Sequence, residues 1–192
     1  MHVSILRVLF EHYLSEIDLF IELGCGTGLN LFLLSQMFPT GNFWGGDWAS
    51  ASQKILSLIT QETKTNINSF NFNFKNMGKF EQINLPKRSA ILTIHALEQV
   101  GSKFENTLKF ILEQNVELVF HIEPLIELYN QESELDNVAL IYHRHLNYLT
   151  GYLPEIRRLE KAGDIEILEC RRLGFGGTWH EAYGLLVWRH IQ

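Results

Sequence analysis

The sequence is poor in cysteine, in basic residues and in long hydrophobic runs, and each shortage narrows the class of protein. Two cysteines among 192 residues cannot form a disulfide framework, so we expect a reducing compartment, the cytoplasm. The apolar stretch at residues 3–10 is interrupted by Arg7 and followed by Glu11, which argues against a signal peptide or a membrane span. Only 16 basic residues stand against 22 acidic ones, and the net charge of −6 argues against a nucleic-acid partner bound through its phosphates.

A glycine-rich segment is the most informative feature that the sequence does contain. Residues 22–28 read Glu-Leu-Gly-Cys-Gly-Thr-Gly and lie between an apolar strand-like run and an apolar helix-like one. A strand, a glycine turn and a helix in this order let a ligand approach the backbone closely, because glycine has no Cβ. A dinucleotide fingerprint would need its third glycine at the position of Leu29, so the spacing disfavours a nicotinamide-dependent enzyme.

The segment 22–28 resembles motif I of the class I methyltransferases, which use S-adenosylmethionine. The resemblance implies that the glycines admit this cofactor, and that Glu22 orders the loop and lies near the amino end of the cofactor. Cys25 suits a tight turn because it is small, and we do not expect it to act as a nucleophile. The alternative is a glycine-rich turn without a ligand.

A second acidic residue, Asp47, ends the next strand-like segment, residues 42–47. A carboxylate at this strand end can accept hydrogen bonds from both ribose hydroxyls of an adenosine ligand. The matching acid of the resembling family has this role, which the resemblance therefore implies for Asp47. The alternative is a cap for the helix predicted from about residue 50, and both roles can hold together.

The predicted adenine contact departs from the family pattern. Residues 70–74 alternate Phe and Asn and predict a half-buried strand, which is followed by Lys75, Asn76 and Met77. The family usually has an acid and then a small or apolar residue at this point, where they touch the adenine. Asn76 replaces the acid, although its amide oxygen could still accept a hydrogen bond from the adenine amino group. A simple turn after the strand is the alternative.

Strand and helix signals alternate along the chain, which predicts an α/β fold with helices on both faces of a parallel sheet. The resemblance implies a doubly wound, mostly parallel seven-stranded sheet that ends in an antiparallel C-terminal hairpin. We expect one domain, residues 1–192, with an N-terminal helix over 1–17, a cofactor-binding core over 18–123, and substrate-side helices and closing strands over 124–192. The expected strands are residues 19–23, 43–47, 70–74, 89–95, 116–123, 164–170 and 182–188, and the expected helices residues 5–14, 29–38, 50–62 and 152–163.

Three titratable residues are candidates for catalysis. Methyl transfer to an oxygen can need a general base as the proton leaves, and an imidazole suits that task near neutral pH. His95 and Glu123 end the fourth and fifth predicted strands, the edge at which open α/β sheets bind ligands. His180 lies in a glycine-rich loop that could close on an acceptor. For His95, a contact with the methionine part of the cofactor is favoured over base catalysis.

The other histidines of this half of the chain are weaker candidates. His121 alternates within the fifth predicted strand and is expected to be structural. His143 and His145 are spaced as in a strand or lie in a loop, so a surface position and a substrate contact both stay open. Together with His180 and Glu181 they could supply metal ligands, but their spacing does not demand a metal, and we predict none.

These observations together predict a methyltransferase that transfers a methyl group from S-adenosylmethionine to a small-molecule acceptor, through a hydroxyl oxygen. The last third of the chain loosely resembles bacterial saccharide-modifying methyltransferases, which favours a hydroxyl acceptor. The alternative from another class is a protein that binds the cofactor without turnover, as a scaffold or regulatory subunit. We predict no nucleic-acid or membrane partner and leave a homodimer open. The predicted cofactor-binding residues are Glu22, Gly24, Cys25, Gly26, Gly28, Asp47, Trp48, Asn76, Met77 and His95.

Overall fold

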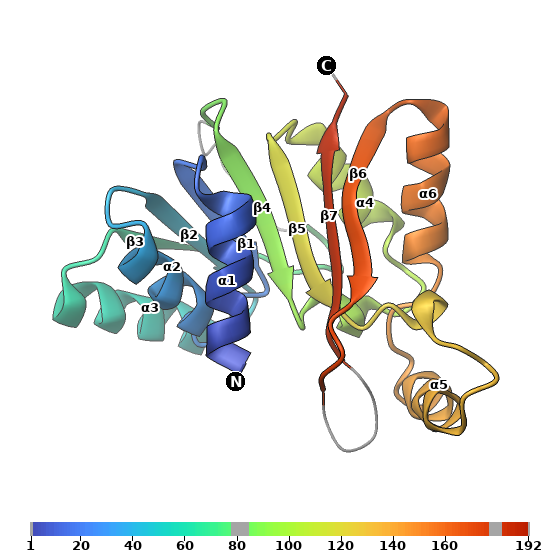
Figure 1. The fold of residues 1–192 in the computed structure, drawn as a ribbon. Helices are drawn as coiled ribbons and strands as arrows, with labels where there is room; N and C mark the ends of the chain where they lie inside the picture. The colour runs from blue at the N-terminus through green and yellow to red at the C-terminus, as the bar shows by residue number, and fades with distance from the viewer. Residues whose placement is uncertain (1, 78–84, 177–181, 192) are drawn as a thin grey trace. The chain divides into compact units, whose positions relative to one another are not determined.

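The computed structural model describes residues 2–77, 85–176 and 182–191, and within these ranges it contains a seven-stranded sheet (Figure 1). The strand order is β3-β2-β1-β4-β5-β7-β6. The strands are β1 (Leu19–Leu23), β2 (Asn42–Asp47), β3 (Ile67–Asn71), β4 (Ser89–Ile94), β5 (Leu118–Glu123), β6 (Ile165–Arg172) and β7 (Gly184–His190). The helices are α1 (His2–Leu14), α2 (Leu29–Met37), α3 (Ser50–Thr63), α4 (Glu105–Glu113), α5 (Glu134–Leu146) and α6 (Tyr152–Ala162), with short 3-10 turns η1 (Leu97–Val100) and η2 (Ile126–Leu128).

The pairing directions confirm the predicted fold class. β1 pairs in parallel with β2 and with β4, and β2 pairs in parallel with β3. β7 is antiparallel to both β5 and β6, which makes the predicted C-terminal hairpin. The chain divides into two compact units, residues 1–92 and 93–192, which are described separately below. The predicted division of a single domain into 1–17, 18–123 and 124–192 stays a prediction.

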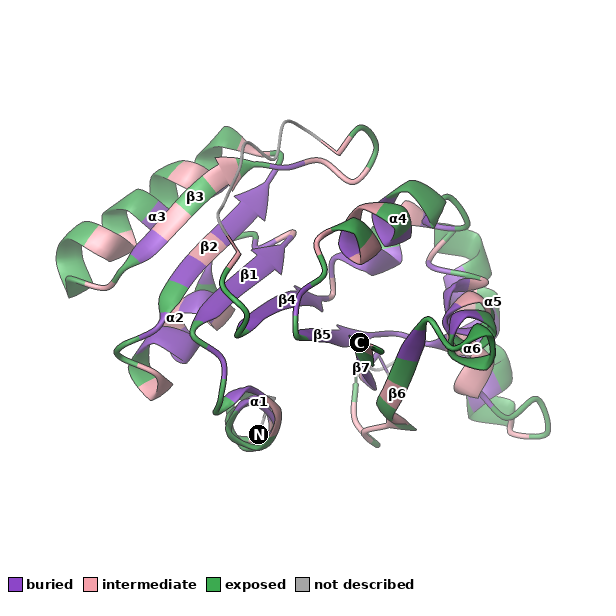
Figure 2. Cartoon of the chain, turned by 90° about the horizontal axis from the view of Figure 1, so that it is seen from above, coloured by how far each residue is buried: buried purple, intermediate pink, exposed green. Residues whose placement is uncertain are grey.

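In residues 1–92 the core consists of apolar strands covered by helices. Every residue of β1 is buried, as expected for an inner strand of a parallel sheet (Figure 2). The ring of Phe20 on β1 stacks on Phe38 and on Phe43, with centroid separations of 5.4 and 5.1 Å. α2 packs on β2 and beside α1, while α3 packs on β3 and β2. This packing fixes the loop that follows β1, because the strand before the loop and the helix after it are both anchored in the core.

In residues 93–192 the buried centre is formed by β5 and β7. All residues of β5 are buried, and the run from Leu185 to Trp188 on β7 is fully enclosed. In β6, the last strand of the sheet, only Ile165 is buried and the other residues are intermediate or exposed, and α6 packs against this strand. Figure 2 shows the corresponding contrast between the buried strands and the mixed outer surfaces of α4, α5 and α6.

Several elements differ from the sequence-based expectations: α4 was not predicted, and β3 and α5 differ most among the rest. β3 covers Ile67–Asn71 rather than residues 70–74, because its ladder with β2 ends where Asp47 pairs with Asn71. The alternating phenylalanines therefore continue beyond the strand, and Phe72 turns into the core instead. Residues 134–146, for which a strand-like or loop conformation was expected around the histidines, form helix α5, whose N-cap Ser133 accepts a hydrogen bond from the Asp136 amide.

Candidate functional site

The glycine loop is attached to the neighbouring strand by backbone hydrogen bonds. The amides of Gly24 and Cys25 both donate to the carbonyl oxygen of Gly46 on β2, at 2.7 and 3.1 Å. The amide of Gly28 donates to the carbonyl of Cys25 at 2.8 Å, which closes the turn immediately before α2. In residues 1–92 the loop is therefore held firmly at the carboxyl ends of β1 and β2.

The conformation of the loop accounts for its glycines. Gly24, Gly26 and Gly28 have φ angles of 76°, 53° and 75°, in the left-handed region that side chains disfavour. A Cβ added at Gly28 would lie 2.1 Å from Cδ2 of Leu56, so this glycine is required by helix packing. A Cβ added at Gly26 would meet no heavy atom of the described residues within 4 Å. Gly26 thus presents its backbone to open space, as a ligand-binding loop must.

Asp47 connects this loop to the end of β2. Its Oδ2 accepts a hydrogen bond from the Gly26 amide at 2.9 Å, and its Oδ1 accepts one from the Ala49 amide at 2.8 Å. Ala49 is the N-cap residue of α3, so Asp47 supports the start of that helix as well as the glycine loop. The Asp47 side chain is largely buried, and each of its oxygens retains a further lone pair for a ligand.

The two other titratable residues of the loop have contrasting roles. Glu22 is buried at the end of β1, and its Oε1 accepts a hydrogen bond of 2.7 Å from the Asn30 side chain in the first turn of α2. Burial raises the pKa of the Cys25 thiol far above its ordinary value, and the charges of Glu22 and Asp47 raise it further. Cys25 is therefore protonated at neutral pH, which disfavours a nucleophilic role.

Three further residues predicted to bind the cofactor, two of them at its adenine, lie near β2 and β3. The Trp48 side chain is 69% exposed and directly follows Asp47. Asn76 is exposed and Met77 has a φ of 57°, in a turn beyond the end of β3 that is closed by the Met77 amide bonding to the Asn73 carbonyl at 2.8 Å. Because β3 ends at Asn71, these two residues belong to a turn several residues past the strand rather than to its end.

In residues 93–192, Glu123 holds the loop that follows β4. Its Oε1 accepts hydrogen bonds from the amides of Ala96 and Leu97 at 3.1 and 3.0 Å, and its Oε2 accepts one from the amide of Glu98 at 3.1 Å. Glu123 is fully buried. Burial raises the pKa of Glu123 to about 7 and the charge of Glu98 adds to this, although His95 and the backbone donors act in the opposite direction.

His95 is the first residue of the loop that follows β4, and its backbone is left-handed, with a φ of 52°. Its Nδ1 lies 3.4 Å from Oε2 of Glu98, and its Nε2 is buried with no hydrogen-bond partner among the described residues. Burial alone would lower the pKa of His95, but the hydrogen bond to Glu98 and the charges of Glu123 and Glu98 outweigh it, so the pKa is raised. Sequence analysis identified His95 and Glu123 but missed Glu98, for which the three-residue spacing from His95 was an available signal.

An aromatic side chain that immediately precedes β7 contacts the His95 ring. Tyr183 meets it edge to face, with ring centroids 4.4 Å apart, and Phe175 stacks on Tyr183 at 4.1 Å. Sequence analysis missed Tyr183 as a neighbour of His95, because the two are far apart in the chain. His180, the third predicted catalytic residue, lies outside the described residues, as does Glu181.

His121 is structural, as expected. It is fully buried, and its two ring nitrogens lie 2.8 Å from Oγ1 of Thr93 and 2.9 Å from the hydroxyl of Tyr152. Burial lowers the pKa of His121 to about 3, so the ring is neutral at physiological pH. His143 and His145 lie on α5, the first buried and the second exposed.

The described residues show neither a metal cluster nor a membrane-spanning helix. Among the residues that the structure describes, no three His, Cys, Asp or Glu side chains are grouped so as to hold a metal ion. None of the described helices has the length and hydrophobicity needed to cross a membrane.

Similarity to known proteins comes from structure alone. No protein-family model and no curated protein matches the sequence. A putative O-methyltransferase from Nostoc punctiforme has a TM-score of 0.65 and 12% identity, with 96% of this chain and 54% of that one covered. An O-methyltransferase family 2 protein from Planctomyces limnophilus, in complex with apigenin, has a TM-score of 0.62 and 13% identity over 93% and 52% of the chains.

A third similar structure is nearer to this chain in length. The plantazolicin methyltransferase BpumL, in complex with a triazolic desmethylPZN analog and SAH, has a TM-score of 0.61 and 13% identity over 97% and 81% of the chains. In contrast, the present chain spans about half the length of the Nostoc and Planctomyces proteins. Identities this low establish a shared fold and nothing finer.

Proposed function

We propose that this chain, which has the class I methyltransferase fold, binds S-adenosylmethionine and transfers its methyl group to a hydroxyl oxygen of a small molecule. The observation that carries the proposal is Gly26, whose left-handed backbone adjoins open space while its amide is held by Asp47. A similar structure holds SAH, the product of the same cofactor, and another holds apigenin, a small molecule.

The described residues fit an adenosine ligand at the glycine loop. Gly26 leaves room for close approach to the backbone, and the carboxylate of Asp47 has lone pairs left to accept from ribose hydroxyls. The exposed indole of Trp48 offers an apolar face next to Asp47 for the adenine ring. Glu22, fixed by Asn30, supplies a negative charge suited to the amino end of the cofactor. Asn76 and Met77 stay predictions as adenine contacts.

The chemistry requires chiefly orientation from the protein. When bound, S-adenosylmethionine supplies a methyl group that is already activated on a sulfonium. The residues of the chain then have to hold the acceptor oxygen in line with that group, and such positioning can contribute about 7–11 kcal/mol to lowering a barrier. A base near the acceptor hydroxyl contributes further when the proton is lost during transfer.

We assign the acceptor side to the cluster around His95. With Glu98 at Nδ1, the neutral ring carries its proton there and leaves Nε2 as an acceptor. An acceptor hydroxyl that reached Nε2 would supply the hydrogen bond that Nε2 lacks among the described residues. The stacked pair Phe175 and Tyr183 beside His95 suits a flat ring or the apolar face of a sugar. The prediction that His95 lines the methionine part of the cofactor, and the catalytic prediction for His180, remain predictions.

Glu123 is better assigned as a positioning residue than as a catalytic one. Both of its oxygens are occupied by backbone donors, and the carboxylate is enclosed, so it has no free face for an acceptor. Its effect on the reaction would pass through the loop that carries His95.

A cofactor-binding protein without turnover is the second candidate. Asn76 favours it, because this residue replaces the acid of the resembling family and lies exposed in a turn beyond β3. This candidate and the methyltransferase make the same prediction for binding and opposite predictions for turnover.

Turnover with a panel of acceptors separates the two. The purified chain is incubated with methyl-labelled S-adenosylmethionine and catechols, flavonoids or monosaccharides, and labelled product and SAH are measured. We expect transfer to at least one hydroxyl acceptor, with kcat reduced about 100-fold or more in His95→Ala and SAH affinity unchanged. His12→Ala, an exposed histidine on α1, is the matched control and should retain full activity. SAH binding with no transfer to any acceptor would favour the scaffold.

The Glu123→Gln variant should change how stability depends on pH. The pKa of Glu123 is raised from 4.5 to about 7 on folding, so the folded chain retains a proton that the unfolded chain releases. The corresponding stabilisation is complete below about pH 4.5 and is lost as the pH rises through about 7, a difference on the order of 3 kcal/mol. Glu123→Gln should lose this part of the pH dependence. It should also be less stable than wild type, because its amide nitrogen cannot accept the hydrogen bonds that one carboxylate oxygen accepts from the backbone.

Urea denaturation between about pH 4.5 and 8 measures both effects. Glu117→Gln, which alters an exposed carboxylate just before β5, should keep the wild-type pH profile. An unchanged profile in Glu123→Gln would show that Glu123 does not hold the proton.

A further inference from the structure

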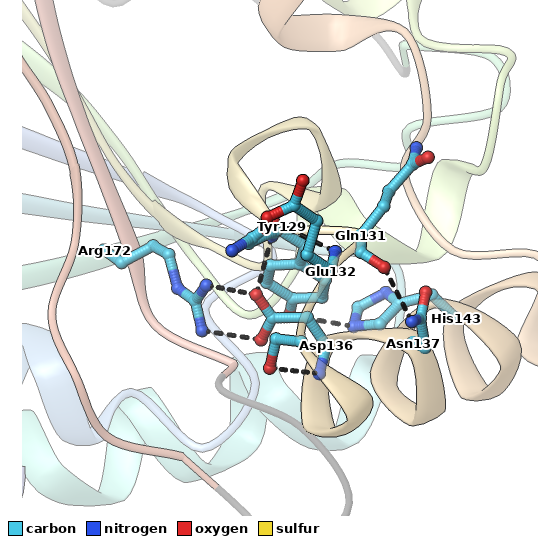
Figure 3. A network of polar contacts seen from close by, with 9 residues as sticks. Tyr129, Gln131, Glu132, Asp136, Asn137, His143 and Arg172 are labelled. Atoms are coloured by element: carbon cyan, nitrogen blue, oxygen red, sulfur yellow. Dashed lines mark hydrogen bonds and ion pairs between the residues drawn. The ribbon is translucent and has the colours of Figure 1, made fainter.

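Helix α5 is fastened to the rest of residues 93–192 by a polar network on one side (Figure 3). The guanidinium of Arg172, at the end of β6, donates to both oxygens of Asp136, at 2.6 and 2.9 Å. The same carboxylate accepts a hydrogen bond from the Asn130 amide at 2.7 Å. Arg172 also lies over the ring of Tyr129, 5.0 Å from its centroid. These contacts give α5 a fixed orientation, because its anchoring carboxylate is buried and bidentately paired.

The apolar inner side of α5 packs on the segment that precedes it, which contains Ile126 and Tyr129. Ala139 and Leu140 form a small buried cluster with Tyr129, to which Ile126 also contributes. His143 continues this inner side, with its ring 5.8 Å from that of Tyr129. The buried side of α5 therefore packs against other parts of residues 93–192.

The outer side of α5 carries a row of four exposed residues, which we call the outer row: Glu134, Val138, Ile141 and His145. Spacings of four, three and four residues place them on one face of a helix, opposite the buried Asp136 and His143. Val138 is 47% exposed and Ile141 66%, which leaves two large aliphatic side chains in water at the centre of the row.

The residues of the outer row are arranged symmetrically about its midpoint, with apolar residues at the centre and groups of complementary chemistry at the two ends. Val138 and Ile141 are equidistant from the midpoint of the row, and so are Glu134 and His145. An antiparallel copy of the helix, related by a two-fold axis through that midpoint, would set Val138 of one copy against Ile141 of the other. The same operation sets the acidic start of each helix against the basic end of the other, where Arg144 lies next to His145.

We propose that the outer row of α5 is a self-complementary interface through which two copies of this chain pair, with their α5 helices antiparallel. A second copy is the occupant that the pattern fits, because a two-fold interface needs each patch to be complementary to itself. An unrelated partner would not require apolar and charged residues to be placed symmetrically about one point. The inference is independent of the proposed methyl transfer.

The interface is small, so the dimer should be weak. The helix has 13 residues, which corresponds to a length of about 20 Å. A contact limited to one such helix from each copy falls below the roughly 1,200 Å² of typical stable interfaces, although the flanking Leu135, 81% exposed, enlarges it. We therefore expect an equilibrium between monomer and dimer at protein concentrations on the order of 10–500 µM.

Charge reversal tests the pairing, with sedimentation velocity across that concentration range as the readout. Glu134→Arg sets positive charge against His145 and Arg144, and His145→Glu sets negative charge against Glu134. Each variant alone should associate at least about 10-fold more weakly than wild type. An equimolar mixture of the two variants should recover association, because both charge pairs are attractive in the mixed dimer.

Two controls separate this interface from general effects. Glu105→Arg makes the same change in the first turn of α4, at another exposed position, and should associate like wild type. Val138→Ser tests the apolar centre without a change of charge and should weaken association, while circular dichroism checks that each variant is folded. A wild-type chain that stays monomeric over the whole range, or a mixture of variants that fails to recover association, would overturn the proposal and assign the outer row to another partner.

Discussion

Replacing Asp47 with alanine is expected to weaken the binding of SAH by at least about 100-fold while the chain stays folded. The change removes a carboxylate that has lone pairs for ribose hydroxyls, and hydrogen bonds to a charged group contribute about 1.5–3 kcal/mol each. It also leaves the Gly26 and Ala49 amides without their acceptor, so the glycine loop loses a support at the point where the ligand approaches. The two effects act in the same direction.

Equilibrium dialysis with labelled SAH measures this loss. Asp47→Asn keeps one side-chain oxygen as an acceptor and should show an intermediate affinity. Asp164→Ala removes an exposed carboxylate in the other compact unit and serves as the matched control, with wild-type affinity expected. Wild-type affinity in Asp47→Ala would remove Asp47 from the binding site.

Two alanine substitutions in the glycine loop should have opposite consequences. Gly28→Ala places a Cβ 2.1 Å from Leu56 at a φ of 75°, and we expect a loss of about 2–6 kcal/mol in unfolding free energy. That loss is a large part of the roughly 5–15 kcal/mol by which domains are stable. Urea denaturation measures it, and the variant should express poorly or unfold early.

Gly26→Ala should leave the fold nearly intact but weaken SAH binding. Its added Cβ meets none of the described atoms within 4 Å, so only the left-handed φ of 53° opposes it, at a cost of about 1–2 kcal/mol. The same methyl group occupies the space through which the ligand reaches the backbone. Equal losses of stability in the two variants, or unchanged SAH affinity in Gly26→Ala, would contradict this account of the loop.

The proposed cofactor side could be predicted from the sequence because its signals are local. β1 is an apolar run interrupted only by Glu22 and followed directly by Gly24, and its predicted bounds match the observed ones. The glycine spacing predicted a special backbone, and all three glycines have left-handed φ angles. Two roles were predicted for Asp47. Its carboxylate accepts a hydrogen bond from the Ala49 amide, but Ala49 and not Asp47 is the N-cap residue of α3, and the ribose role stays a prediction.

The surroundings of His95, which we propose as the acceptor side, could not be predicted to the same depth because their contacts are long-range. Glu123 was identified by its place at a strand end, but sequence cannot tell that its carboxylate turns toward the amides of residues 96–98. Tyr183 comes to His95 only because the C-terminal hairpin folds back. Helix α5 was missed because the alternating His and Arg residues at 143–145 suggested the period of a strand. Its buried side includes two polar residues, Asp136 and His143, which a search for apolar periodicity does not count.

Calorimetric titration of the wild-type chain with SAH tests the central claim most directly, with NADH as the comparison ligand. The proposed site predicts saturable one-to-one binding of SAH and no binding of NADH, since the loop has leucine where a dinucleotide fingerprint has its third glycine. No heat from SAH at any concentration, or saturable binding of NADH instead, would contradict the assignment of the glycine loop and Asp47 as a site for S-adenosylmethionine.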